Sequence, residues 1–271
     1  MAVISIDGSQ RKAARIAGFL YLITFAIVVA ANFGIADRLI VHGNPAATVQ
    51  NIRAHETLFR INIAAFVIYS AGVVGLLSAL YVALKPVSAG LALAASLFRF
   101  VFALIWLVAP LSMYLVLRVL SSQYLHVVGT GQLQALAQLA VGGGFEGYYI
   151  GLPFFGLAST LTFYLFFKSG YVPRLLGVVG AIASGWCVIS ALAFIAIPDF
   201  DKTMSLWWLD SAMGLSELAL GFRLAFMGIK SPEVQALGAR ANMTTAGREN
   251  SQSSQSVKKK TSAQTASIAT P

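Results

Sequence analysis

Charged residues are scarce in this 271-residue chain. They make up 11% of the sequence and hydrophobic residues 58%, whereas soluble proteins have roughly 25% and 45–50%. These few charges cannot cover the surface of a soluble protein. The composition therefore excludes a soluble protein. The apolar stretches are long enough for transmembrane helices, unlike the roughly ten-residue alternating segments of a membrane barrel. The composition therefore indicates a polytopic helical membrane protein.

Acidic residues are the scarcer charge, with 10 Asp and Glu against 19 Lys and Arg. The basic excess lies mainly at the two ends, because segments 1–15 and 230–271 hold nine of the Lys and Arg residues and only three acids. No aromatic residues are interleaved in a basic face, so we expect no nucleic-acid partner. We expect the lipid bilayer to be the main partner, with the basic ends near its anionic surface.

Several chemical signatures are missing. The single cysteine, Cys187, lies in an apolar run, so it forms no internal disulfide and is expected to pack. The chain has no HExxH, G-x-S-x-G, CxxC or P-loop motif. His42, His55 and His126 all fall outside the apolar runs, which leaves no axial histidine for a haem in the bilayer. We therefore expect no metal and no cofactor.

Six long apolar runs predict six transmembrane helices. The first run is longer than the apolar core of a signal peptide, so we expect it to be retained. The third corresponds to about 48 Å of helix, so it is expected to tilt, protrude or kink at Pro110. The predicted spans are residues 16–36, 61–84, 89–120, 147–167, 175–197 and 207–229.

Two segments between spans predict short interfacial helices. Asn44 and Pro45 supply an N-cap and a first-turn proline for a helix over about 44–59. Thr130 precedes a second apolar repeat, which the glycine run 142–144 is expected to end. A purely connecting role for both segments stays open.

The expected fold is thus an all-α membrane bundle of six transmembrane helices with two short interfacial helices. Residues 1–15 form an N-terminal segment, 16–229 the membrane domain, and 230–271, which lack apolar periodicity, a disordered tail. With six spans both ends lie on one side. That side collects twelve Lys and Arg against five on the other, which predicts a cell-membrane protein with cytoplasmic termini.

Ionisable residues inside the spans give the only candidate site. Arg99 in the third span and Glu217 in the sixth are predicted at similar depth near the bilayer midplane, where a lone charge costs several kcal/mol or more. We expect an acid of the sixth helix to compensate Arg99, with Glu217 preferred over Asp210. Arg223 lies nearer the inner edge and is expected to reach the headgroups.

Spacing on the sixth span supports a shared face. Asp210, Gly214, Glu217 and Gly221 are separated by four, three and four residues, which places them on one stripe of a helix. The glycines permit close approach of a neighbouring helix and the acids supply polar contacts to it. Arg99, Asp210, Glu217 and Arg223 therefore form the candidate polar cavity between the third and sixth helices.

Three interpretations of the Arg99 and Glu217 pair stay open: a structural ion pair, a polar substrate or ion site that includes proton relay by Glu217, and snorkelling toward lipid. The leading functional hypothesis is non-enzymatic binding or passage of a small solute or lipid. The alternatives are a lipid-modifying membrane enzyme with Glu217 or Asp210 as general base, and a structural or regulatory subunit. For a structural or regulatory subunit, the partner would be a second copy of the chain in a homo-oligomer or another membrane protein.

The string from Gly147 to Gly180, and within it SGYVPRLLG from Ser169 to Gly177, resembles an uncharacterised bacterial membrane family, domain of unknown function 4386. The resemblance covers roughly residues 14–229 and implies a fold and topology without an activity. It also implies histidines before the Gly147-Tyr148 pair and after Leu157. This chain has Glu146 and Ala158 there, so it cannot use such histidines chemically in the same way.

Overall fold

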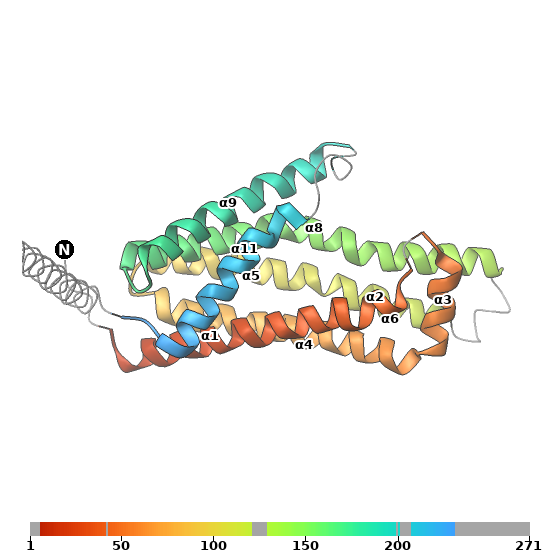
Figure 1. Ribbon diagram of the computed structural model, residues 1–271, viewed down its shortest axis with the longest axis horizontal. Helices are drawn as coiled ribbons and strands as arrows, with labels where there is room; N and C mark the ends of the chain where they lie inside the picture. Colours follow the sequence, from red (N-terminus) through yellow and green to blue (C-terminus); the bar gives the residue numbers. More distant parts are fainter. Residues whose placement is uncertain (1–5, 42, 121–128, 199, 201–206, 231–271) are drawn as a thin grey trace, which may run out of the picture. The chain divides into compact units, whose positions relative to one another are not determined.

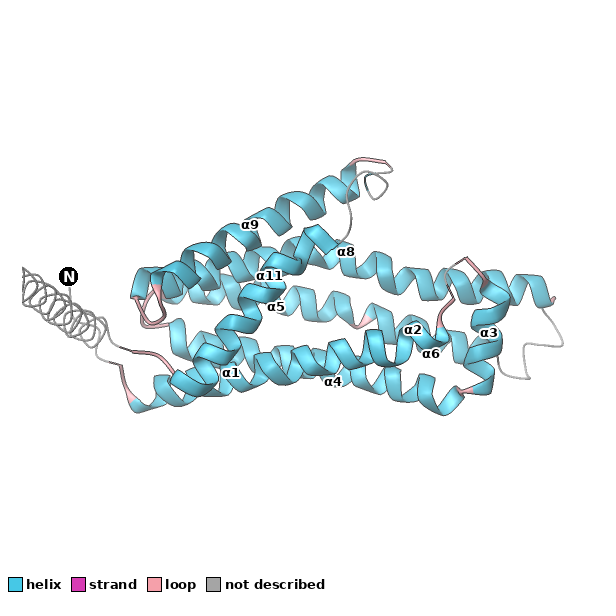
Figure 2. Cartoon of the chain, in the orientation of Figure 1, coloured by secondary structure: helices cyan, strands magenta, loops and turns pink. Residues whose placement is uncertain are grey.

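The computed structural model describes residues 6–41, 43–120, 129–198, 200 and 207–230, which form a bundle of helices (Figure 1). Coloured by secondary structure, these residues are helices joined by short loops and turns, with no strand among them (Figure 2). The all-α prediction is confirmed. The predicted disordered tail, His42 and His126 lie outside the described residues.

The first helix, α1, runs from Gly8 to Val29, so it begins well before the predicted apolar span. A capping box fixes this start: the Asp7 carboxylate accepts from the Gln10 N–H at 2.6 Å, and the Gln10 side chain accepts from the Asp7 N–H at 3.2 Å. Part of the predicted N-terminal segment is therefore helical. The chain continues through the π-helix η1, Ala30–Ala36, and the short α2, Asp37–Leu39.

Among the described residues, five helical stretches are long and apolar enough to cross a membrane: Gly8–Leu39, Glu56–Leu84, Ala89–Val119, Gly147–Ser169 and Arg174–Ala196. They correspond to the first five predicted spans and support a membrane-embedded bundle. The sixth predicted span is helical as well, but it is not among the five. Its α-helix has 16 residues and it carries three charged residues. The corresponding elements are α4 (Glu56–Leu84), α5 (Ala89–Trp106), α6 (Val108–Val119), α9 (Arg174–Ala196), α11 (Trp207–Phe222) and η2 (Arg223–Met227).

The third span breaks at Leu107, between α5 and α6 and three residues before Pro110, where a kink was one of the three expected outcomes. Pro110 has no N–H, so the Trp106 carbonyl cannot receive the helical hydrogen bond from it. The Leu107 N–H instead donates to the Leu104 carbonyl at 3.1 Å, a tightened turn, and the regular pattern resumes with Leu111. The break therefore lies within the turn that precedes the proline.

The first predicted short helix is present, although it ends at Ala54 and Phe59 belongs to α4. The second short helix is wrong. Helix α3, Pro45–Ala54, has Asn44 as its N-cap, whose side chain accepts from the Ala47 N–H at 3.0 Å. In place of the second there is one continuous helix, α8, Thr130–Ser169, which includes the glycine run 142–144. A helical glycine costs about 1 kcal/mol relative to alanine, and α8 offsets this by packing along α5, α6 and α9.

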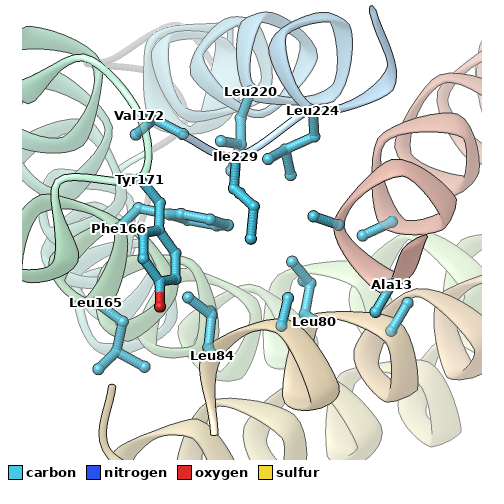
Figure 3. Packing of buried hydrophobic residues seen from close by; sticks show 14 of the residues in the cluster. Ala13, Leu80, Leu84, Leu165, Phe166, Tyr171, Val172, Leu220, Leu224 and Ile229 are labelled. Carbon is cyan, nitrogen blue, oxygen red and sulfur yellow. The ribbon is translucent and has the colours of Figure 1, made fainter. Parts of the chain in front are cut away.

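The buried apolar residues form clusters on either side of the candidate site. One cluster gathers residues of α1, α4, the α8–α9 connection and the end of α11 and η2, including Leu84, Tyr171 and Leu224 (Figure 3). A second surrounds Phe66, Phe102 and Trp106. Because Ala92 belongs to the first cluster and Phe102 to the second, α5 places Arg99 between them.

A single glycine sets the crossing of α1 with η2. A Cβ built on Gly18 would lie 2.7 Å from the Cα of Ala225, a backbone atom that cannot rotate away. A Cβ on Gly185 of α9, by contrast, would meet nothing within 4 Å.

We expect Gly18→Ala to lower stability by about 1–3 kcal/mol, because the two backbones must separate. Thermal unfolding of the purified protein in mild detergent measures this. Gly185→Ala is the matched control and should be neutral or raise stability by up to about 1 kcal/mol through helix propensity. Equal stability of the two variants would show that the crossing does not depend on Gly18.

Candidate functional site

Arg99 is the centre of the site. Its side chain is only 2% exposed and projects from the buried face of α5, which also carries Ala92, Ala95 and Phe102. The short alanine side chains fit the close packing on this face. Guanidinium Nη2 donates to Glu217 Oε1 of α11 at 2.6 Å and to Ser159 Oγ of α8 at 2.8 Å. The predicted pairing of Arg99 with Glu217 is therefore present in the structure.

Ser159 completes a triangle of hydrogen bonds. Its hydroxyl accepts from Arg99 and donates to Glu217 Oε1 at 2.6 Å, so the three side chains share one polar centre. Ser159 is fully buried. Three helices meet here, from positions far apart in the chain. The charge-assisted hydrogen bonds among them are the strong kind in protein interiors.

Two aromatic rings cover the guanidinium. Arg99 Cζ lies 5.5 Å from the ring centroid of Tyr21 in α1 and 4.9 Å from that of Phe155 in α8. Both distances are within the range of a cation–π contact. The rings compensate part of the lost hydration of Arg99 and exclude water from the sides that they cover.

A partly open cavity of about 10 Å³ reaches Arg99, which is room for about one water molecule. Guanidinium Nε and Nη1 have no hydrogen-bond acceptor among the described residues, since both bonds come from Nη2. The cavity thus adjoins a cation with unused donors. Its lining is mostly apolar and comes from α4, α5 and α8, including Leu77, Leu80, Leu84, Ala92, Ala95 and Thr162.

The four candidate residues do not all converge. Asp210 is half-buried and accepts a hydrogen bond from the Tyr148 hydroxyl of α8. Arg223 Nη1 donates to the Gly228 carbonyl at 2.7 Å, so it caps the end of η2. Only Arg99 and Glu217 meet, and the cavity beside Arg99 is lined by α4, α5 and α8 instead of by α5 and α11.

A series of contacting aromatic rings lies between the two acids of α11, Glu217 and Asp210. The Phe155 ring stacks on Phe102 at 4.6 Å, Phe102 lies 5.7 Å from Trp106, and Trp106 lies 5.4 Å from Tyr148, which holds Asp210. These four rings therefore form a continuous series of contacts from Arg99 to the side chain that hydrogen-bonds Asp210.

The glycines of the α11 stripe differ in role. A Cβ on Gly221 would lie 2.8 Å from Cβ of Tyr21, so this glycine brings α11 close to α1, whereas the acids contact α5 and α8; the predicted single neighbour for the whole stripe is wrong. A Cβ on Gly214 would meet nothing within 4 Å. The close neighbour of the stripe is therefore α1 at the Gly221 end.

Other residues were missed by the sequence reasoning. Ser159, Tyr21 and Phe155 are neutral, and nothing in their spacing distinguishes them from packing residues. Asn62 of α4 is also fully buried, and neither of its amide atoms has a partner among the described residues.

Cys187 is a buried free cysteine, in agreement with the packing role predicted for it. Among the described residues no group of three or more His, Cys, Asp or Glu side chains could hold a metal ion.

In the part of the chain that the structure describes, five helices long and apolar enough to span a membrane, together with a buried ion pair, define an integral membrane protein of the all-α class. The chain matches the family described as Domain of unknown function (DUF4386) over residues 16–228, and it belongs to that family. The match covers the helical bundle and the whole Arg99 centre. No curated protein and no solved structure matches the chain.

Proposed function

We propose that this membrane protein binds a small solute or a lipid without transforming it chemically, and that an oxygen anion of the ligand contacts Arg99. The observation that carries this proposal is a buried guanidinium that lines a cavity and makes both of its hydrogen bonds through Nη2. An oxygen anion in the cavity can accept a charge-assisted hydrogen bond from a guanidinium N–H.

The contacts around Arg99 indicate the chemistry of the ligand. Glu217 already places a carboxylate oxygen against Nη2, with the Ser159 hydroxyl donating to the same oxygen. The centre is therefore built to hold a carboxylate-like group. A carboxylate, a sulfonate or a phosphate monoester offers the same oxygens.

The cavity lining leaves two sources for such an anion. Leu77, Leu80 and Leu84 on α4 face Ala92 and Ala95 on α5 across it, so its walls are apolar; because it holds about one water molecule, an alkyl tail can enter only where α4 and α5 separate. A lipid-like molecule would enter with its head toward Arg99. A small water-soluble anion would use the guanidinium alone.

We also propose that both ends of the bundle lie on the cytoplasmic side of the cell membrane. Gln10 near the start of α1 donates to the Ala83 carbonyl near the end of α4 and to the Tyr171 hydroxyl after α8. A Cβ on Gly228, after η2, would lie 3.8 Å from Arg15 Nε. These contacts bring the start of α1, with Arg15, together with the ends of α4, α8 and η2 at one end of the bundle, and the positive-inside rule favours the cytoplasmic side for such basic residues.

Reporter fusions test the orientation. A phosphatase that works only outside the cytoplasm should be inactive when fused after Gln255 or before Met1, and a fluorescent protein that folds in the cytoplasm should be bright at both places. Phosphatase activity at either end would contradict the proposed orientation.

Octanesulfonate tests the ligand proposal because its charge is fixed and its tail is apolar. We expect saturable binding to the protein in nanodiscs, measured by calorimetry. The reference is the double variant Arg99→Met with Glu217→Leu, which removes both buried charges and should fold. Binding to this variant should be weaker by about tenfold or more, because one charge-assisted hydrogen bond contributes about 1.5–3 kcal/mol.

Two further ligands separate the sources. Octanol has the tail without the charge and should not compete with octanesulfonate. Methanesulfonate has the head without the tail: competition at similar concentration indicates a small solute, and its failure indicates a lipid-like ligand. Equal octanesulfonate binding by the wild type and the double variant would refute a site at Arg99.

A further inference from the structure

We infer that an anionic phospholipid binds on the outer surface of the bundle where α1 crosses η2. Its phosphate lies between Arg15 and Arg223, and an acyl chain covers the aromatic rings that begin one turn further into the membrane. The site is separate from the Arg99 cavity, which is lined by α4, α5 and α8, so it stands whether or not that cavity binds a ligand.

Two arginine side chains meet at the end of η2, beside the start of α1 (Figure 1). Arg223 Nη1 donates to the Gly228 carbonyl at 2.7 Å, so its side chain extends toward the end of the helix, as a snorkelling arginine does. From α1, Arg15 brings Nε to 3.8 Å from the position that a Cβ on Gly228 would take. Both guanidinium groups therefore lie beside one residue.

No acid in the described part of the chain balances these two cations, since neither arginine forms an ion pair there. Arg11 lies one turn before Arg15 and is also exposed, so it adds a third positive charge on the same face of α1. The carboxylate of Asp7, at the start of this helix, already accepts from the Gln10 N–H. Like charges at this spacing repel each other. An anion bound among them removes that repulsion.

Three aromatic rings lie next to the arginines and bridge the two helices. The Phe19 ring meets that of Phe226 edge to face at 6.1 Å, and Phe222 stacks on Phe226 at 6.0 Å. Phe19, Phe222 and Phe226 are 48%, 51% and 66% exposed, so they form one open apolar surface. The close backbone approach of Gly18 and Ala225 holds this surface together, because Phe19 and Phe226 are the next residues along the two helices.

The order of these groups matches an anionic phospholipid. Phe19 lies one turn after Arg15, within a stretch long and apolar enough to cross the membrane, so lipid chains reach the rings while the arginines lie nearer the end of the bundle. A phosphodiester accepts charge-assisted hydrogen bonds from guanidinium groups. A soluble phosphate would leave the rings uncovered, and a zwitterionic lipid brings a cation that the arginines repel.

Native mass spectrometry of the full chain in mild detergent tests the site, because it counts bound lipids one at a time. The probes are dioleoylphosphatidylglycerol and dioleoylphosphatidylcholine, which have the same acyl chains and differ in net charge. We expect the first phosphatidylglycerol to bind about tenfold more tightly than the first phosphatidylcholine, because each basic residue near a headgroup favours the anion.

Single arginine variants locate the binding. Arg15→Gln should lower the affinity for phosphatidylglycerol about fivefold and leave that for phosphatidylcholine unchanged, and Arg223→Gln should act in the same direction. Lys168→Gln is the matched control, because it removes an exposed cation from the end of α8, which packs along α5, α6 and α9. Its effect should be less than about twofold, since salt screens an exposed charge outside the site.

Glycerophosphoglycerol, the headgroup without acyl chains, tests whether the occupant is a lipid. It should not displace phosphatidylglycerol at similar concentration, because it leaves the aromatic surface uncovered. Displacement by this compound would show that a soluble anion suffices and would overturn the lipid as the occupant.

Two other results would overturn the site itself. One is equal affinity of the wild type for both phospholipids. The other is an equal loss of phosphatidylglycerol affinity in Arg15→Gln and Lys168→Gln, which would show a general effect of charge. Should Arg223→Gln fail to fold because the Gly228 contact is lost, Arg15→Gln decides, since Arg15 makes no hydrogen bond among the described residues.

Discussion

The buried ion pair between Arg99 and Glu217 is the constraint on which the rest of the bundle depends. Two charges far from water are tolerated only when they meet with good geometry and when their remaining hydrogen bonds are satisfied. Residues separated by 118 positions must therefore come together, and Ser159 with them. Apolar surface gives membrane helices little preference for one neighbour over another, since lipid tails are equally apolar. The pair supplies that preference for α5, α8 and α11.

Close backbone approach makes the ion pair geometrically feasible. Gly18 and Gly221 allow α11 and η2 to lie against α1, because side chains there would overlap with the neighbouring helix. The same approach places the Tyr21 ring over the guanidinium. Small residues and buried charge are thus parts of one arrangement: the glycines bring the helices together, and the charges fix which helices they are.

The sequence predicted features whose cause is local or depends on depth alone. Apolar length located the first five spans, and Asn44 with Pro45 located α3, because a cap and a first-turn proline act within one turn. Arg99 was matched to Glu217 by counting residues from the membrane surface. Depth was sufficient there because a charge near the midplane has few partners to choose from.

Features that depend on tertiary packing were not predictable from one sequence. The glycine run 142–144 ends an isolated helix, but packing keeps α8 continuous through it. Ser159 and Phe155 have no charge to reveal their role. Asp210 was grouped with Arg99 in one candidate cavity, whereas its partner is the Tyr148 hydroxyl. The side from which a cavity approaches Arg99 depends on how α4, α5 and α8 pack, which spacing along single helices does not specify.

A double-mutant cycle on the ion pair tests the central claim most directly. Arg99→Met and Glu217→Leu should each cost about 3–5 kcal/mol, because each leaves an unpaired buried charge, whereas the double variant should be nearly as stable as the wild type. Thermal stability in detergent is the measurement. Recovery in the double variant would show that the two residues meet and compensate each other. Strictly additive losses would contradict the pairing and remove the basis of a site at Arg99.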